Sequence, residues 1–358
     1  MHEPKKQIEQ ETTLENSLAP LPSHDLIPPR QSRIAFAIVC LIGLVALIVT
    51  VLNFGKISAF TEQIAQAEPE WLVLAVSSQC AAFLCIALAW RLVLRRLDEP
   101  LNLYALFPLS VAKLFVDQAL PSGGLSGAAF LLHALKRRGV SWDHAFSAFI
   151  FGSSTFIFAF ILSSFVSFIA IAGAENTPSI FKIGARAFYV ISLAITVGLA
   201  IVAIFRFTKV TAWLSHYPRA VSLMKLIDAA ITRIASEKPL FLKVTLIQIV
   251  QRVFDALTLW LAFMAIGGAA PFGACFIGLS IASVAATIAP TPMGIGAFEG
   301  GLVATLTIFG VSLEAALTAT LLFRGLSLWA PMLPGFFIVQ RELLHSRGIQ
   351  PRNAPPLP

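Results

Sequence analysis

The chain contains a series of long apolar blocks, of which residues 34–52 (IAFAIVCLIGLVALIVTVL) are a clear example. A helix needs about 20 apolar residues to cross a hydrocarbon core about 30 Å thick. Hydrophobic residues make up 57% of the chain and charged residues 13%, against about 25% charged in a typical soluble domain. Because backbone polar groups must be satisfied within lipid, each crossing segment is expected to be helical. The sequence therefore predicts an all-α, polytopic transmembrane helical bundle.

The apolar blocks divide the chain into one membrane domain and two tails. Residues 1–33 are polar and mixed in charge, unlike a cleavable signal peptide, so we predict a disordered cytoplasmic tail. Residues 34–341 are expected to form a single transmembrane domain, and residues 342–358 a second cytoplasmic tail. The expected helices are residues 34–54, 71–94, 101–120, 125–135, 144–173, 187–205, 240–266, 272–289, 296–310 and 314–339.

Lysine and arginine are distributed unevenly between these blocks. The cationic stretches are the tail up to Arg33 with four, 91–96 with three, 136–138 with three, 206–243 with seven and 341–352 with three. Short loops rich in lysine and arginine stay on the cytoplasmic side of a membrane. We therefore predict a multi-pass membrane protein with both termini in the cytoplasm. The same bias accounts for the net charge of +7, so no nucleic-acid partner is expected.

The charge pattern also predicts two re-entrant hairpins. Residues 101–135 must enter the membrane from the cytoplasm and return to it, because both flanking stretches are cationic. The second arm is about 11 residues, or ~16 Å of helix, which is too short to span. We expect a bend at PSGG, residues 121–124, and a second hairpin, residues 272–310, that enters from the outer face and bends at PTPMG. The alternative makes the first arms full crossings and places LKRRG outside, against the charge rule.

A duplication is visible within the chain. GVSWDHAFSAF begins at Gly139 and GVSLEAALTAT begins at Gly310, an offset of 171 residues. The same offset aligns two pairs of bend residues, Pro121 with Pro292 and Gly123 with Gly294. We therefore predict two repeat units of about 71–173 and 240–341, joined by an amphipathic linker at 206–238. Charge counting orients the units oppositely, which is the inverted-topology repeat by which transporters build a site near the bilayer midplane.

The two bends are candidates for a lipid head-group site. Glycine permits turns and close backbone approach, and proline stops a helix. The arms that follow the bends begin with N–H groups expected to be free, and a helix start attracts anions such as phosphate. Enlarging Gly123 or Gly294 to valine should then block lipid movement and leave folding largely intact. The alternative is that these small residues serve only tight helix packing. The bend residues proposed to bind the head group are Pro121, Gly123, Gly124, Gly127, Pro290, Pro292, Gly294 and Gly296.

Six ionisable residues fall within the predicted membrane region, where each costs about 2.5–3.5 kcal/mol on insertion scales. They are Lys113, Asp117, Arg252, Asp255, Glu299 and Arg324. The first two are spaced i,i+4 and the next two i,i+3, so each pair could neutralise itself on one helix face. Glu299 and Arg324 lack local partners and are expected to pair across the second unit. Two roles stay open for these residues: holding the bundle together, or lending a cation to a substrate phosphate in transit.

Known catalytic and cofactor motifs are missing from the sequence. It contains no GxxxxGK[ST], HExxH or nucleophile elbow, so neither ATP hydrolysis nor zinc or serine hydrolysis is indicated. We expect no enzyme activity and no cofactor. Cys40, Cys80, Cys85 and Cys275 lie in apolar blocks without the spacing of metal ligands, and no metal site is expected.

Two motifs, PSGGLSGAAFLLHALKRRG at 121–139 and a stretch at 290–335 that begins PTPMGIGAFEGG, resemble the flippase-like family typified by the membrane region of bacterial lysylphosphatidylglycerol synthases. The family pattern is approximately Pro-x-Pro-Gly-Gly-x-Gly-x-x-Glu followed by a late Arg. It maps onto Pro290, Pro292, Gly294, Gly296, Glu299 and Arg324. Met293 stands where glycine is frequent, and Leu131 stands where many members carry arginine.

The resemblance implies a stand-alone protein of the plasma membrane, the inner membrane of a bacterium. Such a protein is expected to move or handle a phospholipid or glycolipid across that membrane without ATP. The soluble synthase domain is expected to be absent, so the chain should not itself make lysyl-lipid. Our leading hypothesis is a flippase-like or scramblase-like lipid translocator whose partner is a lipid with an anionic head group. The alternatives are an accessory subunit that docks an envelope lipid-biosynthesis enzyme, and an ion-coupled transporter of a small anion.

Overall fold

The structure, a computed structural model, describes residues 67–119, 124–172, 232, 236–289 and 294–347. Within these ranges the regular structure is helical and contains no strand. Four stretches there are long and apolar enough to cross a membrane: Pro69–Arg96, Trp142–Ala170, Lys238–Ala265 and Leu313–Glu342. The prediction of an all-α, polytopic transmembrane bundle is confirmed.

Several predicted segments lie outside the described residues. They are the tail 1–33, the apolar blocks 34–54 and 187–205, nearly all of the linker 206–238, and the bend residues 120–123 and 290–293. Of the second predicted tail, only residues 342–347 are described. The division into two tails and one domain therefore stays a prediction.

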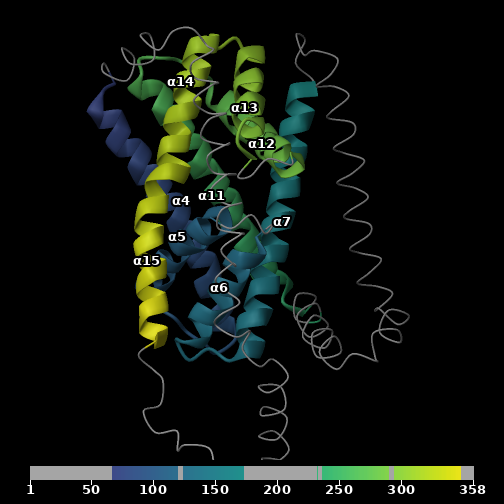
Figure 1. The fold of residues 1–358 in the computed structure, drawn as a ribbon. Helices are drawn as coiled ribbons and strands as arrows, with labels where there is room; N and C mark the ends of the chain where they lie inside the picture. The colour runs from purple at the N-terminus through teal and green to yellow at the C-terminus, as the bar shows by residue number, and fades with distance from the viewer. Residues whose placement is uncertain (1–66, 120–123, 173–231, 233–235, 290–293, 348–358) are drawn as a thin grey trace, which may run out of the picture.

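The described helices form two series of similar lengths (Figure 1). The first series is α4 (Pro69–Arg96), α5 (Leu103–Ala119), α6 (Leu125–Lys136) and α7 (Trp142–Ala172). The second is α11 (Lys238–Ala265), α12 (Phe272–Ile288), α13 (Ala297–Ile308) and a long helix made of α14 (Leu313–Arg324), the π-helical turn η2 (Gly325–Trp329) and α15 (Ala330–Arg347). The first three members match in length at 28, 17 and 12 residues.

The two GVS motifs have one structural role, which is to end one helix and begin the next. Gly139 and Gly310 adopt φ of 89° and 83°, a left-handed conformation that glycine takes without strain. The N–H of each following valine then donates to an earlier carbonyl in the helix, Val140 to Leu135 and Val311 to Leu306, as in a Schellman cap. In the second motif Ser312 is the N-cap of α14, where its side chain accepts the N–H of Ala315 at 3.4 Å.

The first helices of the two series pack side by side and run in opposite directions. The N–H of Glu68, just before α4, donates to the carbonyl of Ala265 at the end of α11 at 2.9 Å. At the other end, Arg96 of α4 forms an ion pair with Glu237, just before α11, at 2.6 Å. The two series therefore begin at opposite ends of the bundle.

Each short hairpin packs on the last helix of the other series. α5 contacts α6 and α15, whereas α12 contacts α13 and α7. In Figure 1 the α5–α6 pair lies toward the lower end of the bundle and the α12–α13 pair toward the upper end. At 1.5 Å per residue, a 12-residue arm such as α6 or α13 is about 18 Å long and too short to span a membrane. This arrangement is the one expected of an inverted repeat with re-entrant hairpins, and both stay predictions.

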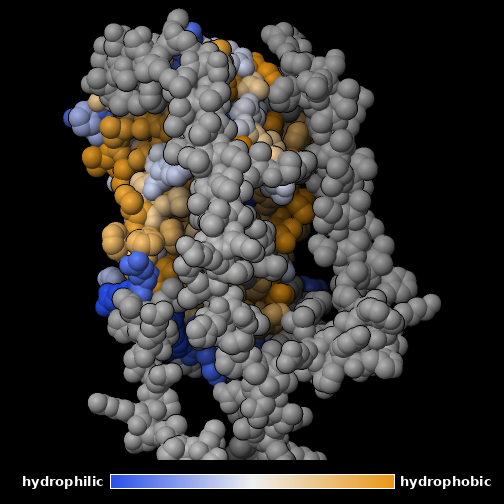
Figure 2. Space-filling model, in the orientation of Figure 1, coloured by the Kyte–Doolittle hydropathy of each residue, from blue (hydrophilic) through white to orange (hydrophobic). Residues whose placement is uncertain are grey.

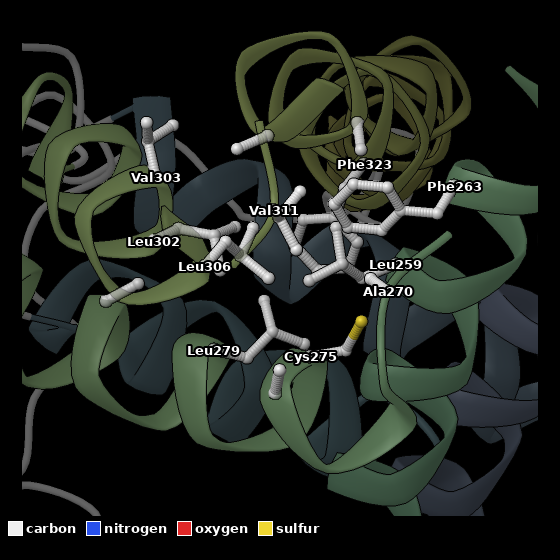
Figure 3. Packing of buried hydrophobic residues seen from close by; sticks show 14 of the residues in the cluster. Leu259, Phe263, Ala270, Cys275, Leu279, Leu302, Val303, Leu306, Val311 and Phe323 are labelled. Atoms are coloured by element: carbon white, nitrogen blue, oxygen red, sulfur yellow. The ribbon is translucent and has the colours of Figure 1, made fainter. Parts of the chain in front are cut away.

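Two large apolar cores, each built largely from one series, and a smaller cluster hold the bundle together. The smaller cluster joins the two series through Phe168 of α7 and Ile281 and Val284 of α12. The first core joins α4, α5, α6 and α7, with Leu94, Leu106, Leu131 and Leu135 among its fully buried side chains. The second joins α11, α12, α13 and α14 around Phe263, Leu302 and Leu306 (Figure 3). Each hairpin is therefore fixed by apolar packing inside its own series and by its contact with the last helix of the other series.

The outward faces of the long helices are apolar. Large exposed hydrophobic side chains include Val73 and Leu74 of α4, Val166 and Ile169 of α7, and Leu333 and Phe337 of α15. Figure 2 shows apolar residues over the middle of one face and hydrophilic residues gathered toward its lower end. An apolar girdle of this kind fits a lipid-facing surface.

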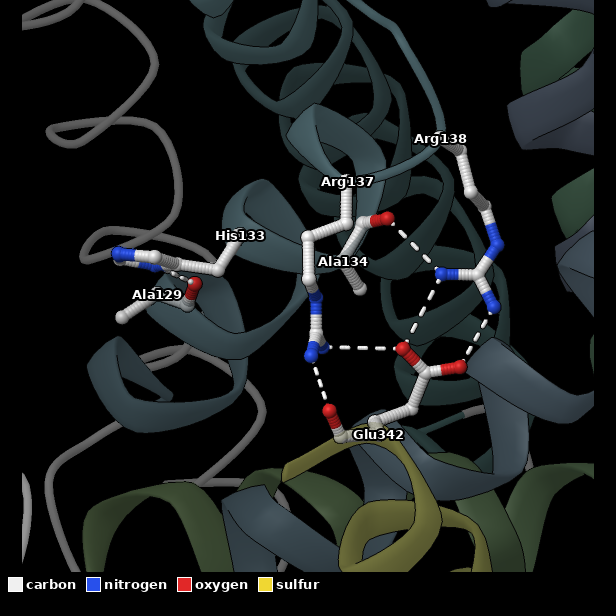
Figure 4. A network of polar contacts seen from close by, with 6 residues as sticks. All are labelled: Ala129, His133, Ala134, Arg137, Arg138 and Glu342. Carbon is white, nitrogen blue, oxygen red and sulfur yellow. Dashed lines mark hydrogen bonds and ion pairs between the residues drawn. The ribbon is translucent and has the colours of Figure 1, made fainter. Parts of the chain in front are cut away.

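The hydrophilic end contains a network of ion pairs (Figure 4). Arg137 and Arg138, just after α6, both bind Glu342 of α15, at 2.9 and 2.6 Å. Nearby, Glu99 after α4 contacts His144 of α7 at 3.1 Å. These contacts bring the cationic stretches 91–96 and 136–138 to one end of the bundle, together with the end of α15. Placing that end in the cytoplasm stays a prediction.

Candidate functional site

A partly open cavity of about 220 Å³ lies between the two series of helices. α4, α5, α11, α12, α13, α14 and η2 all contribute to its lining. The lining includes Arg252 and Asp255, which lie near the middle of the 28-residue α11. Its polar side chains are Gln79, Gln118, Gln251, Arg252, Asp255, Ser280, Ser283, Arg324 and Ser327. Three of the six predicted ionisable residues, Arg252, Asp255 and Arg324, therefore line one cavity.

Asp255 accepts hydrogen bonds from two glutamine amides. Gln251, one turn earlier on α11, donates through Nε2 to Oδ2 at 2.8 Å. Gln79 of α4 donates through Nε2 to Oδ1 at 3.4 Å, and its side chain is buried at 7% exposure. The carboxylate is thus satisfied by neutral donors from two helices.

The predicted pairing of Arg252 with Asp255 holds only as an attraction between the two charges, without a direct ion pair. Among the described residues, no ion pair joins the two side chains, although they are three positions apart. The Arg252 guanidinium instead lies over the rings of Phe156 and Phe160 of α7, at 5.3 and 4.8 Å from the ring centres. These aromatic faces attract a cation without neutralising its charge.

Three buried polar atoms of the cavity lining have no hydrogen-bond partner among the described residues. They are Oε1 of Gln79, Oε1 of Gln251 and Nε of Arg252. Leaving a buried donor or acceptor without a hydrogen bond costs about 1–3 kcal/mol. Unpaired atoms of both kinds therefore make the cavity suited to a polar occupant.

The predicted pair between Glu299 and Arg324 is present. Nε of Arg324, at the end of α14, lies 2.6 Å from Oε1 of Glu299 in the first turn of α13, and the side chains are only 10% and 12% exposed. The guanidinium also stacks over Phe298 at 4.5 Å from the ring centre. Because Arg324 lines the cavity, this pair links the second hairpin to the polar interior.

The predicted pair between Lys113 and Asp117 is also present, with Nζ 2.6 Å from Oδ2 along α5. Neither residue lines the cavity, although Leu114 and Gln118 of the same helix do. Oδ1 of Asp117 accepts the N–H of Gly127 in the first turn of α6 at 3.1 Å. This pair therefore closes the first hairpin on itself.

The backbone donors at the starts of the second arms are not free, contrary to expectation, at two of the predicted positions. Gly127 N–H is bound by Asp117, and Gly296 N–H donates to Oε2 of Glu299 at 2.7 Å. The protein's own carboxylates thus satisfy the positive helix ends. Gly124 and Gly296 adopt φ of 88° and 86°, so both are needed for the turn into the arm.

Gly294 is a packing residue as well as a turn residue. Its φ is 64°, and a Cβ added there would lie 2.4 Å from Cβ of Ala286 on α12. The expectation that Gly294→Val leaves folding intact is therefore wrong, because the side chain would force the hairpin arms apart. The other predicted bend residues, Pro121, Gly123, Pro290 and Pro292, lie outside the described residues.

Several polar residues of the cavity were missed from the sequence, and Gln79 is the most important. One signal could have found it: Gln79 and Gln248 hold the same position, the eleventh, in the two matching 28-residue helices α4 and α11. Gln248 donates to the carbonyl of Gly152 and the hydroxyl of Thr155 on α7. Each glutamine therefore joins its long helix to a neighbour.

The described residues contain no group of three or more His, Cys, Asp or Glu side chains placed to hold a metal ion. The expectation that the chain uses no metal or cofactor stays a prediction. The arrangement present is a polar, partly cationic cavity in an apolar bundle.

Comparison with known proteins agrees with this architecture. The family described as the lysylphosphatidylglycerol synthase TM region matches residues 34–335. The chain is also 20% identical over 319 residues to a UPF0104 membrane protein of Methanocaldococcus jannaschii, covering 84% of this chain and 94% of that protein. The family match covers both hairpins, the cavity lining and both helix series as far as residue 335, in the first part of α15. The chain therefore belongs to the lysylphosphatidylglycerol synthase transmembrane-region family.

Proposed function

We propose that this protein moves an anionic phospholipid or glycolipid between the leaflets of the plasma membrane, as a flippase or scramblase does. The observation that carries this proposal is the polar cavity between the two helix series, which contains the side chains of Arg252 and Arg324. Charged groups inside a bilayer are costly and mark the pathways of polar substrates. Family membership supports a membrane role connected with lipids.

The size of the cavity favours entry of the head group alone. The cavity volume is about 220 Å³. It is smaller than the roughly 300–1,000 Å³ of a typical pocket for a drug-sized ligand. The acyl chains would therefore stay in the bilayer, against the apolar outer faces of helices such as α7 and α15.

Arg252 is the residue best suited to meet a lipid phosphate. Its guanidinium is held by two aromatic rings rather than by a carboxylate, and its buried Nε has no partner among the described residues. A guanidinium binds phosphate through parallel, charge-assisted hydrogen bonds. Arg324 is shared with Glu299 and would contribute a weaker share of positive potential.

We also propose how the protein acts and how it is oriented in the membrane. The protein would act without catalysis and with both termini in the cytoplasm, so that the ion-paired end around Glu342 faces inward. The basic residues gathered at that end support this orientation through the positive-inside rule. An envelope lipid-biosynthesis enzyme could supply or consume the lipid.

Reconstitution tests the proposal directly. The purified chain is placed in liposomes that contain labelled phosphatidylglycerol or labelled phosphatidylcholine, and a membrane-impermeant quencher reports exchange between leaflets. We expect exchange of the anionic lipid well above that of protein-free liposomes. Arg252→Ala should reduce it at least about tenfold, since the lost charge-assisted bonds are worth about 1.5–3 kcal/mol. The control Arg95→Ala changes an exposed arginine at the end of α4 and should leave exchange unchanged.

The same liposomes separate the alternatives. Exchange equal to that of protein-free liposomes would reject translocation and favour the accessory-subunit role. The small volume and the two arginines of the cavity also fit a transporter of a small anion. Uptake of labelled inorganic phosphate, without lipid exchange, would establish that second function instead.

A further inference from the structure

The cavity contains a carboxylate whose role the proposed lipid movement does not explain. Asp255 is the acidic side chain in the described lining, and its hydrogen-bond donors are the amides of Gln79 and Gln251. No cation forms an ion pair with it among the described residues. A carboxylate inside a membrane is costly to keep charged, and such groups commonly serve as proton relays.

The other charged and titratable groups around Asp255 are engaged elsewhere, except Arg252, whose charge attracts that of Asp255 without a direct ion pair. On the elements that pack against α11 or line the cavity, they are Cys85 of α4, Lys113 and Asp117 of α5, Cys275 of α12, Glu299 of α13, Arg324 of α14 and, on α11 itself, Arg252. Lys113 pairs with Asp117, and Arg324 pairs with Glu299. Arg252 is drawn onto the aromatic rings of α7. The middle of α7, from Ala145 to Ala170, carries no ionisable residue.

The two glutamines can satisfy Asp255 in either protonation state. Each now donates through Nε2 to the ionised carboxylate, and each leaves a buried Oε1 with no partner among the described residues. When the carboxylate gains a proton, its new O–H requires an acceptor. A half-turn of either amide places Oε1 in that position, because an amide carries donors on one side and acceptors on the other. The Oε1 atoms of Gln79 and Gln251 can therefore accept the O–H of Asp255 when that carboxylate is protonated.

We propose that Asp255 is a proton-binding site through which the protein couples lipid movement to a proton gradient. The step is an exchange of one proton: the carboxylate takes it from water that enters the cavity from one side and becomes a neutral acid. The acid later returns the proton to water on the opposite side and becomes a carboxylate again. Every bond formed at Asp255 is therefore broken in the second half of the cycle.

Protonation would change the charge that a head group meets. With Asp255 ionised, the two arginines are balanced by Asp255 and Glu299, and with Asp255 protonated the cavity carries one net positive charge. An anionic head group would then bind more tightly, by about tenfold or more for charges a few ångströms apart in a partly buried site. This coupling rests on the proposed lipid transport, and its direction is movement of a proton together with an anionic lipid.

The first experiment detects the proton without any transport. Infrared difference spectra of the reconstituted protein are recorded between pH 5 and pH 8, and the carbonyl band of a protonated carboxylic acid is followed. We expect a band that titrates in wild type, shifts when aspartate is labelled with ¹³C, and disappears in Asp255→Asn. Asp117→Asn, which changes an aspartate paired with Lys113, should keep the band. Absence of an aspartate band in wild type would overturn the proposal without requiring that any variant fold.

The second experiment measures coupling in liposomes with labelled phosphatidylglycerol. A gradient of one pH unit should shift the leaflet distribution of the lipid by up to about tenfold if one proton moves with each lipid. A proton ionophore should abolish the shift, and replacing Na⁺ by choline at constant pH should not change it. Lipid exchange that does not depend on the pH gradient, or that depends on Na⁺, would contradict proton coupling. It would leave the proposed lipid transport intact. If the infrared band of Asp255 titrates but no lipid exchange is seen, the proposed lipid transport is contradicted, and Asp255 is still a proton-binding site.

Discussion

In both hairpins a carboxylate accepts a backbone N–H at the start of the second arm, but its charge is balanced differently. Asp117 comes from the end of the first arm, α5, and Glu299 from the first turn of the second arm, α13. In the first bend, Asp117 binds the N–H of Gly127 and pairs with Lys113, four residues earlier on the same helix. In the second bend, Glu299 binds the N–H of Gly296 and pairs with Arg324, which belongs to a different helix. Both carboxylates cap the positive end of a 12-residue arm.

The source of the cation that pairs with each carboxylate shows which bend contacts the cavity. The first bend carries its own cation, so its pair moves with α5 and lies outside the cavity lining. The second bend depends on a cation from α14 that also lines the cavity, just before the π-helical turn η2. π-helical turns are frequent at functional sites. We infer that the second bend responds to the occupant of the cavity, whereas the first is a self-contained closure.

The sharpest test of the comparison is whether the two hairpins enter from opposite faces. Lys136→Cys marks the end of α6, Leu313→Cys the start of α14 after the second hairpin, and Arg347→Cys the end of α15. A membrane-impermeant thiol reagent should label positions 136 and 347 from the cytoplasmic side only, and position 313 from the outside only. The effect is all or none, because the three positions lie at two ends of one bundle.

Cysteine-free protein is the background for this experiment, and protein with only the native cysteines is its control. If positions 136 and 313 are labelled from the same face, the two bends do not enter from opposite faces. The inverted repeat would then be rejected as well.

Removing either member of the Glu299–Arg324 pair should have the largest effect on stability. The side chains are 10% and 12% exposed, and breaking such a buried pair costs about 3–5 kcal/mol. We expect Glu299→Ala, Arg324→Ala and the double variant to lose similar amounts, measured by denaturant titration in detergent micelles. Arg95→Ala, at an exposed position, serves as the control. Losses that simply add in the double variant would mean that the residues act separately.

A substitution at Gly294 should have an intermediate effect. Its positive φ and the distance of 2.4 Å from an added Cβ to Cβ of Ala286 predict that Gly294→Ala costs about 1–3 kcal/mol. Gly300→Ala is a matched control on α13, because its Cβ would meet no atom within 4 Å and its φ is ordinary. The control should gain up to about 1 kcal/mol from helix propensity. Equal stabilities for the two variants would show that the second bend is not tightly packed.

Most of the described helix boundaries could be predicted because physical limits set them. Bilayer thickness bounds the long helices, and Gly and Pro mark where helices stop. The predicted helix 125–135 is found at Leu125–Lys136, and the predicted helix 240–266 at Lys238–Ala265. The last predicted helix, 314–339, extends to Arg347 and contains the π-helical turn η2. No spacing or composition signal in the sequence indicated that turn.

The ionisable residues show where sequence reasoning reaches its limit. Glu299 and Arg324 were predicted to pair because neither has a partner on its own helix, and burial then forces them together. Arg252 and Asp255 have spacing that permits a local pair, but Gln79 from α4 and two phenylalanines from α7 compete for them. Spacing along one helix does not contain this information, because the competitors come from distant parts of the chain.

The smallest effect on stability is expected for the ion pair at the first bend. Lys113 and Asp117 are 25% and 21% exposed and lie one turn apart on α5. A local pair of this kind stabilises a helix by only about 0.3–0.5 kcal/mol. Their coupling energy in a double-mutant cycle should therefore stay below about 1 kcal/mol, well under that of Glu299 with Arg324. The cycle uses Lys113→Ala, Asp117→Ala and the double variant in the same denaturant titration.

Asp117→Asn separates the two roles of this carboxylate. The amide oxygen of asparagine can still accept the N–H of Gly127, whereas alanine leaves that donor unpaired at a cost of about 1–3 kcal/mol. We therefore expect Asp117→Asn to be less destabilising than Asp117→Ala, because capping of α6 contributes more than the ion pair. If asparagine and alanine prove equally destabilising and the cycle gives a coupling as large as in the second bend, the first bend depends on its charges in the same way. The two bends would then be equivalent, and the cavity-facing role inferred for the second bend alone would be lost.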